Sequence, residues 1–303
     1  APSLVGSEMC IRDRNNRTYT GSVSSNSVSI TISAARLQEL VDGTTYTLTA
    51  DVSDVAGNAA TQLSTTFIYD KTAPSISSIT PSWGSHLNAT EDNSSGTITV
   101  ATSGVEDGQT VTVGLNGTNY TGSVSSNSVT VTISATDLQA LSEGTNTITA
   151  DVSDVAGNAA SQSSTTFVYD KTSPSISSIT LSWGTVLNAT EDNNNGTVTV
   201  ATSGVEDGQT VTLGLNSRTY TGSVSSNSVS ITISAARLQE LIDGSTYTLT
   251  ADVSDVAGNA ATQSSTTFTY DKSAPSISSI TPSWGSHLNA TEDNSSGTIT
   301  VAT

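Results

Sequence analysis

The stretch Asp151-Val-Ser-Asp-Val-Ala-Gly-Asn158 recurs without change at residues 51–58 and 252–259. The copies lie 100 and 101 residues apart, and self-similarity at one long period indicates an array of like modules instead of one large domain. Downstream of the stretch, residues 168–174 end in a proline and have counterparts at 68–74 and 269–275. A proline after a strand-like run predicts a boundary between modules.

These boundaries divide the chain into a non-repeat segment at 1–14, a partial module at 15–72, full modules at 73–172 and 173–273, and a partial module at 274–303. A module of about 100 residues is long enough to bury its own core. The segment 1–14 matches no copy of the repeat and resembles translated adapter read-through, so we interpret it as an assembly artefact and leave it out of the fold prediction. It contains Cys10, the only cysteine, and the modules therefore have no disulfide framework.

The module 73–172 is rich in Thr, Ser, Val and Ile, and its apolar residues alternate with polar ones. This pattern is typical of half-buried antiparallel strands. It predicts strands at 75–80, 96–102, 109–115, 119–124, 128–134, 145–153 and 163–169, with inward-facing Ile98, Val100, Val111, Val113, Leu115, Val129, Val131, Ile133, Ile148, Ala150, Val152, Phe167 and Tyr169. A serine ahead of two leucines predicts a single helical turn within 134–141.

Seven short strands in a module of this length favour an immunoglobulin-like sandwich. The copies differ in length by one residue near Gly144, and an insertion inside a strand would turn every later side chain to the other face. The extra residue is therefore expected in a loop or at the lip of a strand. The predicted fold class is all-β, with tandem immunoglobulin-like β-sandwich modules of about 100 residues.

The chain is strongly acidic, with 27 Asp and Glu against 9 Lys and Arg and a net charge of -18. Such a surface repels nucleic acid and anionic membranes and attracts cations. No apolar run approaches the length of a membrane span. We therefore expect no nucleic-acid partner and no membrane insertion in this fragment.

Catalysis is not supported by the residue types present. The two histidines are His86 and His287, and Val186 holds the corresponding position in the middle copy, so the module does without an imidazole. Glu106 and Asp107 are adjacent acids in a predicted turn, where a solvated loop is a commoner arrangement than a catalytic pair. The chain is not expected to be an enzyme.

Metal binding is better supported than catalysis. The topology of a seven-stranded sandwich brings acidic loops together at the end where the chain enters the module. Oxygen ligands without His or Cys suit a hard cation, and the absence of a fixed octahedral set favours calcium over magnesium. The predicted calcium ligands at the module junctions are Asp70, Glu106, Asp107, Asp151, Asp154, Asp170, Glu206, Asp207, Asp252 and Asp255. Glu91, Asp92 and Asn259 are further candidates. A merely soluble acidic surface is the alternative for each carboxylate.

The motifs in their order resemble the bacterial immunoglobulin-like repeats of giant surface adhesins of the biofilm-associated or RTX type. The resemblance covers residues 15–303 and is carried by Gly104 to Val113, by 134–144, and by Asp154 to Asn158 followed by Tyr169 to Pro174. The turn at 88–91 is similar to the family's Asn-Ala-Ala-Glu turn. Residues 82–84, Ser-Trp-Gly, stand where the family has acidic residues, so no ligand is assigned there.

The resemblance implies extracellular, secreted spacer repeats on the bacterial cell surface, stiffened by calcium at their junctions, that support adhesion and biofilm formation. The partners are then the neighbouring modules, and a terminal domain outside this sequence binds the adhesion target. The alternatives are a module that itself binds carbohydrate or protein, with Trp83 and its copies stacking on a sugar, and accessory domains of a secreted hydrolase. Near-identical copies favour the spacer, because recognition loops would differ between modules.

Overall fold

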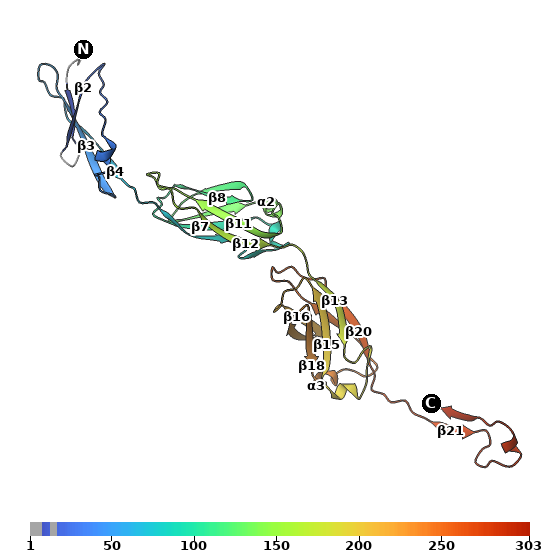
Figure 1. Ribbon diagram of the computed structural model, residues 1–303. Helices are drawn as coiled ribbons and strands as arrows, with labels where there is room; N and C mark the ends of the chain where they lie inside the picture. The colour runs from blue at the N-terminus through green and yellow to red at the C-terminus, as the bar shows by residue number, and fades with distance from the viewer. Residues whose placement is uncertain (1–7, 13–16) are drawn as a thin grey trace. The chain divides into compact units, whose positions relative to one another are not determined.

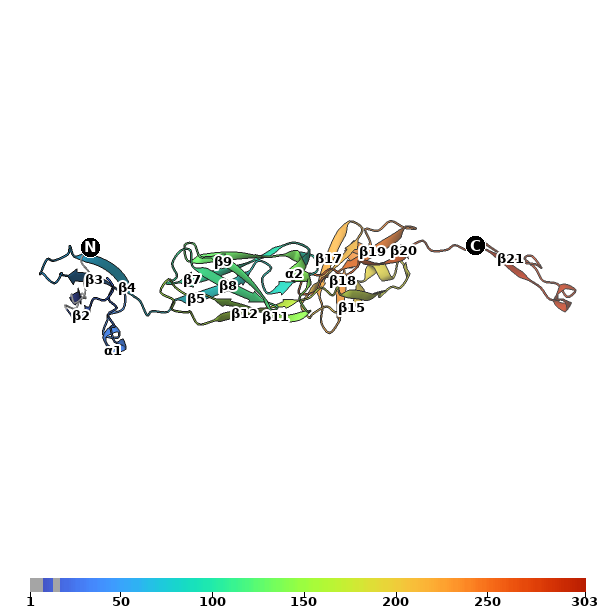
Figure 2. The same cartoon turned by 90° about the horizontal axis from the view of Figure 1, so that it is seen from above.

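The computed structural model describes residues 8–12 and 17–303 of the chain, with side chains for 17–303. The chain divides into two compact units, residues 1–85 with 92–167 and residues 86–91 with 168–303. Two sets of strands have the same order along the sequence, and in each set the short helix, α2 (Ala135–Gln139) or α3 (Ala235–Leu238), lies at one end of the strands (Figure 1, Figure 2).

The strands of both sets fall close to the predicted ranges. The first set is β5 (Ser75–Pro81), β6 (His86–Leu87), β7 (Gly96–Ser103), β8 (Thr110–Leu115), β9 (Thr118–Ser123), β10 (Ser128–Ile133), β11 (Gly144–Asp151) and β12 (Ser163–Tyr169). The second set is β13 (Ser175–Leu181), β14 (Val186–Leu187), β15 (Gly196–Ser203), β16 (Thr210–Leu215), β17 (Arg218–Ser223), β18 (Ser228–Ile233), β19 (Thr246–Asp252) and β20 (Ser264–Tyr270). Single 3-10 turns, η1 (Glu91–Asn93) and η2 (Glu191–Asn193), precede β7 and β15.

Each set forms two sheets. The orders are β10-β7-β5 with β6-β12-β11-β8-β9, and β13-β15-β18 with β14-β20-β19-β16-β17. The short strands β6 and β14 pair in parallel with β12 and β20, whereas the other pairs described in these sheets are antiparallel. The fold is all-β, and its modules are tandem immunoglobulin-like sandwiches, as the alternating pattern predicts.

The core follows the alternation of the strands. All of the predicted inward-facing residues are buried, and in β8 Val111, Val113 and Leu115 have exposures of 0%, 0% and 2%. Trp83 is also in the core at 8% exposure, with its ring edge-on to Phe167 at 5.2 Å between centroids. The tryptophan is therefore part of the core of its sandwich.

The partial module at the start has a sheet of β1 (Glu8–Arg12), β2 (Thr18–Ser22), β3 (Thr44–Val52) and β4 (Leu63–Tyr69), and one helical turn, α1 (Ala34–Leu37). Its order, β2-β1-β3-β4, matches β9-β8-β11-β12. The segment without the repeat sequence thus supplies a strand, β1, at the position of β8 and β16, while residues 1–7, 13 and 14 lie outside the described part. A strand at 28–32, expected from the repeat, is not formed, because its counterpart β10 pairs with β7 and residues 8–72 contain no copy of β7.

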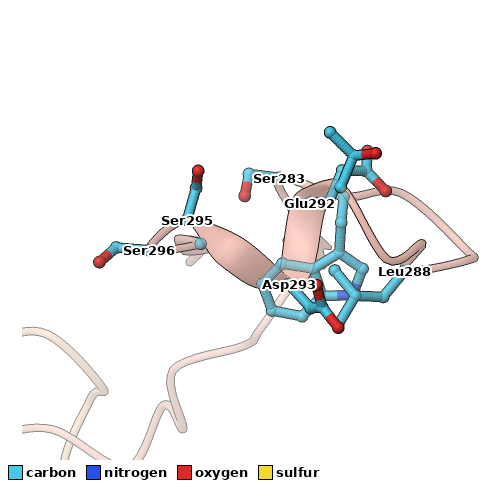
Figure 3. Close-up of a pocket in the computed structure, with 9 residues that line it drawn as sticks. Ser283, Leu288, Glu292, Asp293, Ser295 and Ser296 are labelled. Atoms are coloured by element: carbon cyan, nitrogen blue, oxygen red, sulfur yellow. The ribbon is translucent and has the colours of Figure 1, made fainter.

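The last segment contains β21 (Ser279–Pro282), β22 (Ile299–Ala302) and the 3-10 turn η3 (Glu292–Asn294). A hollow of about 430 Å³ lies beside it, lined by residues that include Trp284, Leu288 and Asp293 (Figure 3). The equivalent Trp183 and Leu187 of the preceding module are buried at 6% and 0% exposure. The hollow is therefore an uncovered core surface, not a built ligand site.

Candidate calcium site at the module connections

Two of the connections between modules are held by an acidic side chain that precedes them in the chain, Asp42 or Asp243. The Lys71 N–H donates to Asp42 Oδ1 at 2.7 Å, and Thr72 Oγ1 donates to Asp42 Oδ2 at 2.5 Å. Asp243 accepts the corresponding bonds from Lys272 and Ser273 at 2.8 and 2.6 Å. The bond from the Thr72 hydroxyl, then that from the Lys71 N–H, lowers the pKa of Asp42.

Asp42 and Asp243 are not among the predicted ligands. The sequence feature that could have indicated their role is an acidic residue directly before a glycine, at 42–43, 143–144 and 243–244. These side chains hold the chain by accepting hydrogen bonds, so they belong to the connection even though they were not predicted to bind calcium.

Two of the predicted ligands, Asp154 and Asp255, have both carboxylate oxygens in hydrogen bonds within their own loops. Asn259 donates from its N–H to Asp255 Oδ1 at 2.8 Å and from Nδ2 to Asp255 Oδ2 at 3.0 Å. Asn158 and Asp154 repeat this pair at 2.8 and 2.9 Å. Burial opposes ionisation of Asp154, but the bonds from Asn158 outweigh it and lower the pKa. These two aspartates stabilise their loops through the hydrogen bonds that they accept.

The same asparagines also contact the connection that precedes their module. Asn259 Nδ2 donates to the carbonyl oxygen of Asp170 at 2.8 Å, and Asn158 Nδ2 donates to that of Asp70 at 3.2 Å. The residue that ends the repeated stretch therefore joins it to the residue that opens the connection. The sequence predicts Asn259 as a candidate ligand at the junction, whereas in the structure its side chain donates to a main-chain carbonyl.

Asp170 and Glu206 are brought together at one hollow of about 310 Å³, which Asn227 also lines. Asp170 Oδ1 accepts a bond from the Thr172 N–H at 2.9 Å, and Glu206 Oε2 accepts one from the Val256 N–H at 2.9 Å. The hydrogen bonds described for these two carboxylates use one oxygen of each. Their other oxygens, Oδ2 and Oε1, are the best candidates to bind a cation.

The other predicted ligands of this module are placed differently. Asp207 Oδ1 accepts a bond from the Ser226 N–H at 2.7 Å and so closes a turn. Asp252 accepts from Gln263 at 3.0 and 2.9 Å and lines a separate hollow. In the preceding copy, Asp70, Glu106, Asp107 and Asp151 accept equivalent bonds from Thr72, Val155, Ser126 and Gln162.

The chemistry of the hollow fits calcium in part. Its two carboxylates and an amide offer only oxygen ligands, which calcium prefers, but calcium takes six to eight of them. Within residues 17–303, no group of three or more His, Cys, Asp or Glu side chains is arranged to hold a metal. An ion bound here would therefore take water for much of its shell, as a weak extracellular site does. The calcium set stays a prediction, with Asp170 and Glu206 as its best supported members.

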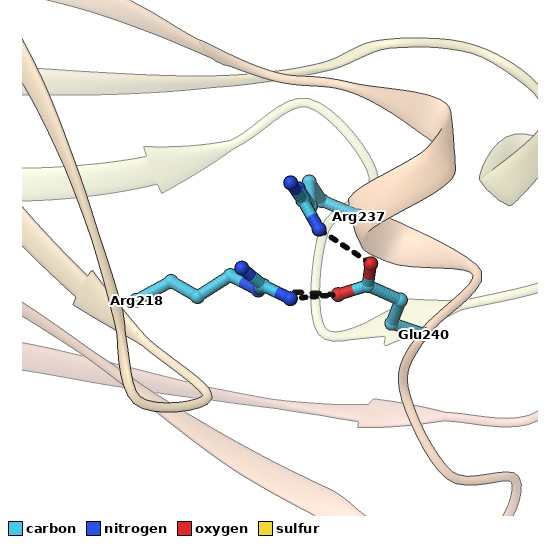
Figure 4. A network of polar contacts seen from close by, with 3 residues as sticks. All are labelled: Arg218, Arg237 and Glu240. Atoms are coloured by element: carbon cyan, nitrogen blue, oxygen red, sulfur yellow. Dashed lines mark hydrogen bonds and ion pairs between the residues drawn. The ribbon is translucent and has the colours of Figure 1, made fainter.

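A further polar cluster joins β17 to α3. Glu240 accepts from Arg218 at 3.1 and 2.8 Å and from Arg237 at 2.5 Å (Figure 4). The three side chains are 40–45% exposed, and exposed ion pairs contribute little to stability. The partial module 15–72 has the same pairs, from Arg17 and Arg36 to Glu39. The module 73–172 has Thr118, Asp137 and Ala140 at these positions, so the cluster is a surface feature that not every copy has.

No family model and no curated protein matches the chain. The similar solved structures include repeats of large bacterial adhesins. One comes from a study of host cell surface retention of a 1.5-MDa bacterial ice-binding adhesin, with 24% identity over 90% of this chain and 88% of the other, at a TM-score of 0.44. Another is a Ca²⁺-stabilised adhesin with which an Antarctic bacterium binds ice, with 24% identity, coverage of 95% and 70%, and a TM-score of 0.42.

A third similar structure is a tetra-tandem repeat from the extending region of a large adhesion protein, with 20% identity, coverage of 99% and 81%, and a TM-score of 0.33. These are proteins of the kind that the sequence motifs resemble. In the described part of the chain, no helix has the length and apolar character needed to span a membrane.

Proposed function

We propose that these modules are extracellular structural spacer repeats of a large bacterial surface adhesin, and that they support cell adhesion and biofilm formation. The observation that carries the proposal is the bond from Asn259 Nδ2 to the Asp170 carbonyl at 2.8 Å, repeated by Asn158 and Asp70 at 3.2 Å. Each sandwich thus holds the chain segment that arrives from the preceding one. Modules that work as spacers in series need such a hydrogen bond between each module and the connection that precedes it.

Calcium stiffens the connection in this proposal. Asp170 lies in the connection and Glu206 in the loop after β15, so one cation bound to both restrains the two segments together. Two carboxylates at one hollow repel each other unless a cation or water separates them. Calcium stabilises only the arrangement in which both ligands converge, with affinities of about 10⁻⁴ to 10⁻³ M typical of extracellular modules.

The adhesion target is bound by a terminal domain outside this sequence, and the neighbouring modules are the partners of each spacer. The rival function, sugar binding through the tryptophans, is disfavoured for the complete modules. Trp83 and Trp183 are buried at 8% and 6% exposure and offer no open ring face for stacking.

Trypsin digestion of the whole chain tests the calcium part, because each connection contains one lysine: Lys71, Lys171 and Lys272. We expect millimolar calcium to slow cleavage at Lys171 relative to chelator, and mass spectrometry distinguishes the sites. Lys272 is the internal control, since no copy of the repeated stretch follows it in this chain. Its cleavage should be the same with calcium and with chelator.

The substitutions Asp170→Asn and Glu206→Gln should each abolish the effect of calcium at Lys171. Asp252→Asn is the matched control, because Asp252 lines a different hollow and should leave the effect intact. If cleavage at Lys171 in the unsubstituted chain is indifferent to calcium, the metal-stiffened spacer is wrong and these acids form only a soluble surface.

A further inference from the structure

The turn at residues 88–91, named here the docking turn, is closed by its own side chains. Asn88 Oδ1 accepts bonds from the N–H groups of Thr90 and Glu91 at 2.8 and 3.0 Å, and Glu91 Oε2 accepts one from the Asn88 N–H at 3.1 Å. The copy at 188–191 has the same bonds at 2.9, 3.1 and 3.1 Å. Asn88 Nδ2 and the Ala89 N–H are two further donors of the docking turn that take no part in these bonds.

Both donors bond to residues 255–259, named here the docking loop. Asn88 Nδ2 donates to the carbonyl oxygen of Ala257 at 2.9 Å, and the Ala89 N–H donates to Asn259 Oδ1 at 3.0 Å. The Asn259 amide also donates to the Asp170 carbonyl and to Asp255. One amide group therefore ties together the docking turn, the connection and the docking loop.

The repeats provide an internal comparison for this contact. Ala257 and Asn259 are buried at 7% and 5% exposure, whereas in the copy of the loop at 154–158 Ala156 is exposed and Asn158 is half-buried. Val256 is 45% exposed and its copy Val155 is 68% exposed. The loops have the same sequence, so the greater burial comes from what lies against the docking loop.

The docking turn is also more buried than its copy. Asn88 and Ala89 are half-buried, whereas Asn188 and Ala189 in the copy of the turn are exposed. Gly258 permits the close approach: its φ is +95°, and a Cβ there would lie 3.2 Å from Asn88 Nδ2. A residue other than glycine would be strained in its backbone and crowded against the turn.

We infer that the Asn-Ala-Thr-Glu turn is a docking surface whose partner is the Asp-Val-Ala-Gly-Asn loop of the following module, and that Asn259 specifies this pairing. The inference rests on the proposed function in one respect, that the modules work in series. Each of the two complete modules carries one turn and one loop. The contact is heterologous, turn to loop, and can therefore repeat from each module to the next along an array. The exposed turn at 188–191 is then ready for the loop of a next module.

Amide exchange measured by NMR on the whole chain tests the docking. The Ala89 N–H should exchange roughly three to ten times more slowly than the Ala189 N–H, as expected for one net hydrogen bond. Asn88→Asp retains the acceptor that closes the turn but loses the donor to Ala257, and it should raise the exchange rate at Ala89 to that at Ala189. Asn188→Asp is the matched control, and it should leave Ala89 unchanged.

Substitutions in the docking loop provide a second test of the docking. Asn259→Ala should also remove the protection of Ala89, whereas Asn58→Ala, the same change in the partial module, should not. Equal exchange at Ala89 and Ala189 in the unsubstituted chain would overturn the docking, whatever calcium does at Lys171. Protection of Ala89 in chelator, with cleavage at Lys171 indifferent to calcium, would support the docking and remove calcium from the proposed function.

Discussion

The hydroxyl of Tyr270 donates a hydrogen bond of 2.5 Å to Asp192 Oδ2, and both side chains are buried, at 1% and 6% exposure. The bond joins the end of β20 to the 3-10 turn η2, two segments that are 78 residues apart in sequence. The bond to Asp192, followed by burial, raises the pKa of Tyr270 to about 12. The protonated phenol is thus specifically favoured in the folded module.

This bond predicts a loss of stability at alkaline pH. An unfolded tyrosine loses its proton near pH 10, whereas Tyr270 in the fold retains it to about pH 12. The stability contributed by this group is therefore complete below pH 10 and is lost as pH rises from 10 to about 12. Urea unfolding at several pH values, followed by NMR signals of the 173–273 core, measures the loss.

The variant Tyr270→Phe should lack this part of the alkaline loss. It should also be less stable at neutral pH, because Asp192 is then buried without its phenol donor. Identical alkaline profiles for the variant and the unsubstituted chain would show that this bond does not set the pH dependence.

Gly196→Ala should destabilise the module that contains it. A Cβ at this position would overlap the ring of Trp183 and crowd Leu238, both in the core. Overpacking of a core costs about 1–3 kcal/mol, which thermal unfolding of the whole chain can resolve. Gly297→Ala is the matched control, because Trp284 lies at an uncovered surface and has room to move. Equal effects of the two substitutions would contradict the packing argument.

The loop at 154–158 should open in acid. The hydrogen bonds from Asn158 lower the pKa of Asp154 against the effect of burial. A group with a lowered pKa stabilises the fold above its unfolded value of 3.8 and loses that contribution as pH falls through its folded value. The chemical shift of the Asn158 N–H, which donates to Asp154, should report the transition. An Asp154→Asn variant with the same acid transition would exclude this aspartate as its cause.

Asp243→Ala should loosen the connection after β20. The substitution removes the acceptor for the Lys272 N–H and the Ser273 hydroxyl, so trypsin should cleave at Lys272 several times faster. Asp252→Ala removes an acid of the same module that bonds only within the module, to Gln263. The prediction is wrong if both variants are cleaved at Lys272 at the rate of the unsubstituted chain.

The repeated strands β15 and β22 should differ in the protection of their amides from hydrogen exchange. Val200 in β15 is fully buried, whereas its counterpart Val301 in β22 is 48% exposed. The amide of Val301 should therefore exchange faster than that of Val200, because a two-stranded ribbon with an open face is only marginally stable. Equal protection of the two amides would show that residues 274–303 are held by contacts that the structure does not describe.

The strands were predictable because their apolar residues alternate over six or more positions, as Val111, Val113 and Leu115 do in β8. The alternation fixes both the strand and the face that it buries. The parallel strand β6 was not predicted, since a pair of residues carries no period and its pairing with β12 depends on tertiary contact. The helical turn α2 was predicted from its serine, and Ser134 does accept a bond from the Asp137 N–H.

The candidate site was predictable only as a location. Loop topology predicts Asp170 and Glu206 at the same junction, and both line one hollow. The sequence cannot show that Asp255 has both oxygens in bonds from Asn259. It also favours charged residues as metal ligands, whereas the described carboxylates of the connections accept hydrogen bonds, and the amides of Asn158 and Asn259 donate to main-chain carbonyls. These bonds depend on the relative placement of residues almost ninety positions apart, such as Asn259 and Asp170.

The position of β1 shows that the order of strands in this sheet does not require the repeat sequence in every strand. Its backbone pairs with β2 and β3 in the place of β8 although its sequence is not that of the repeat. The hydrogen bonds between adjacent strands are made by main-chain N–H and C=O groups, which every residue except proline carries. A sheet of this kind therefore keeps its order of strands when an extended segment of different sequence takes an internal position.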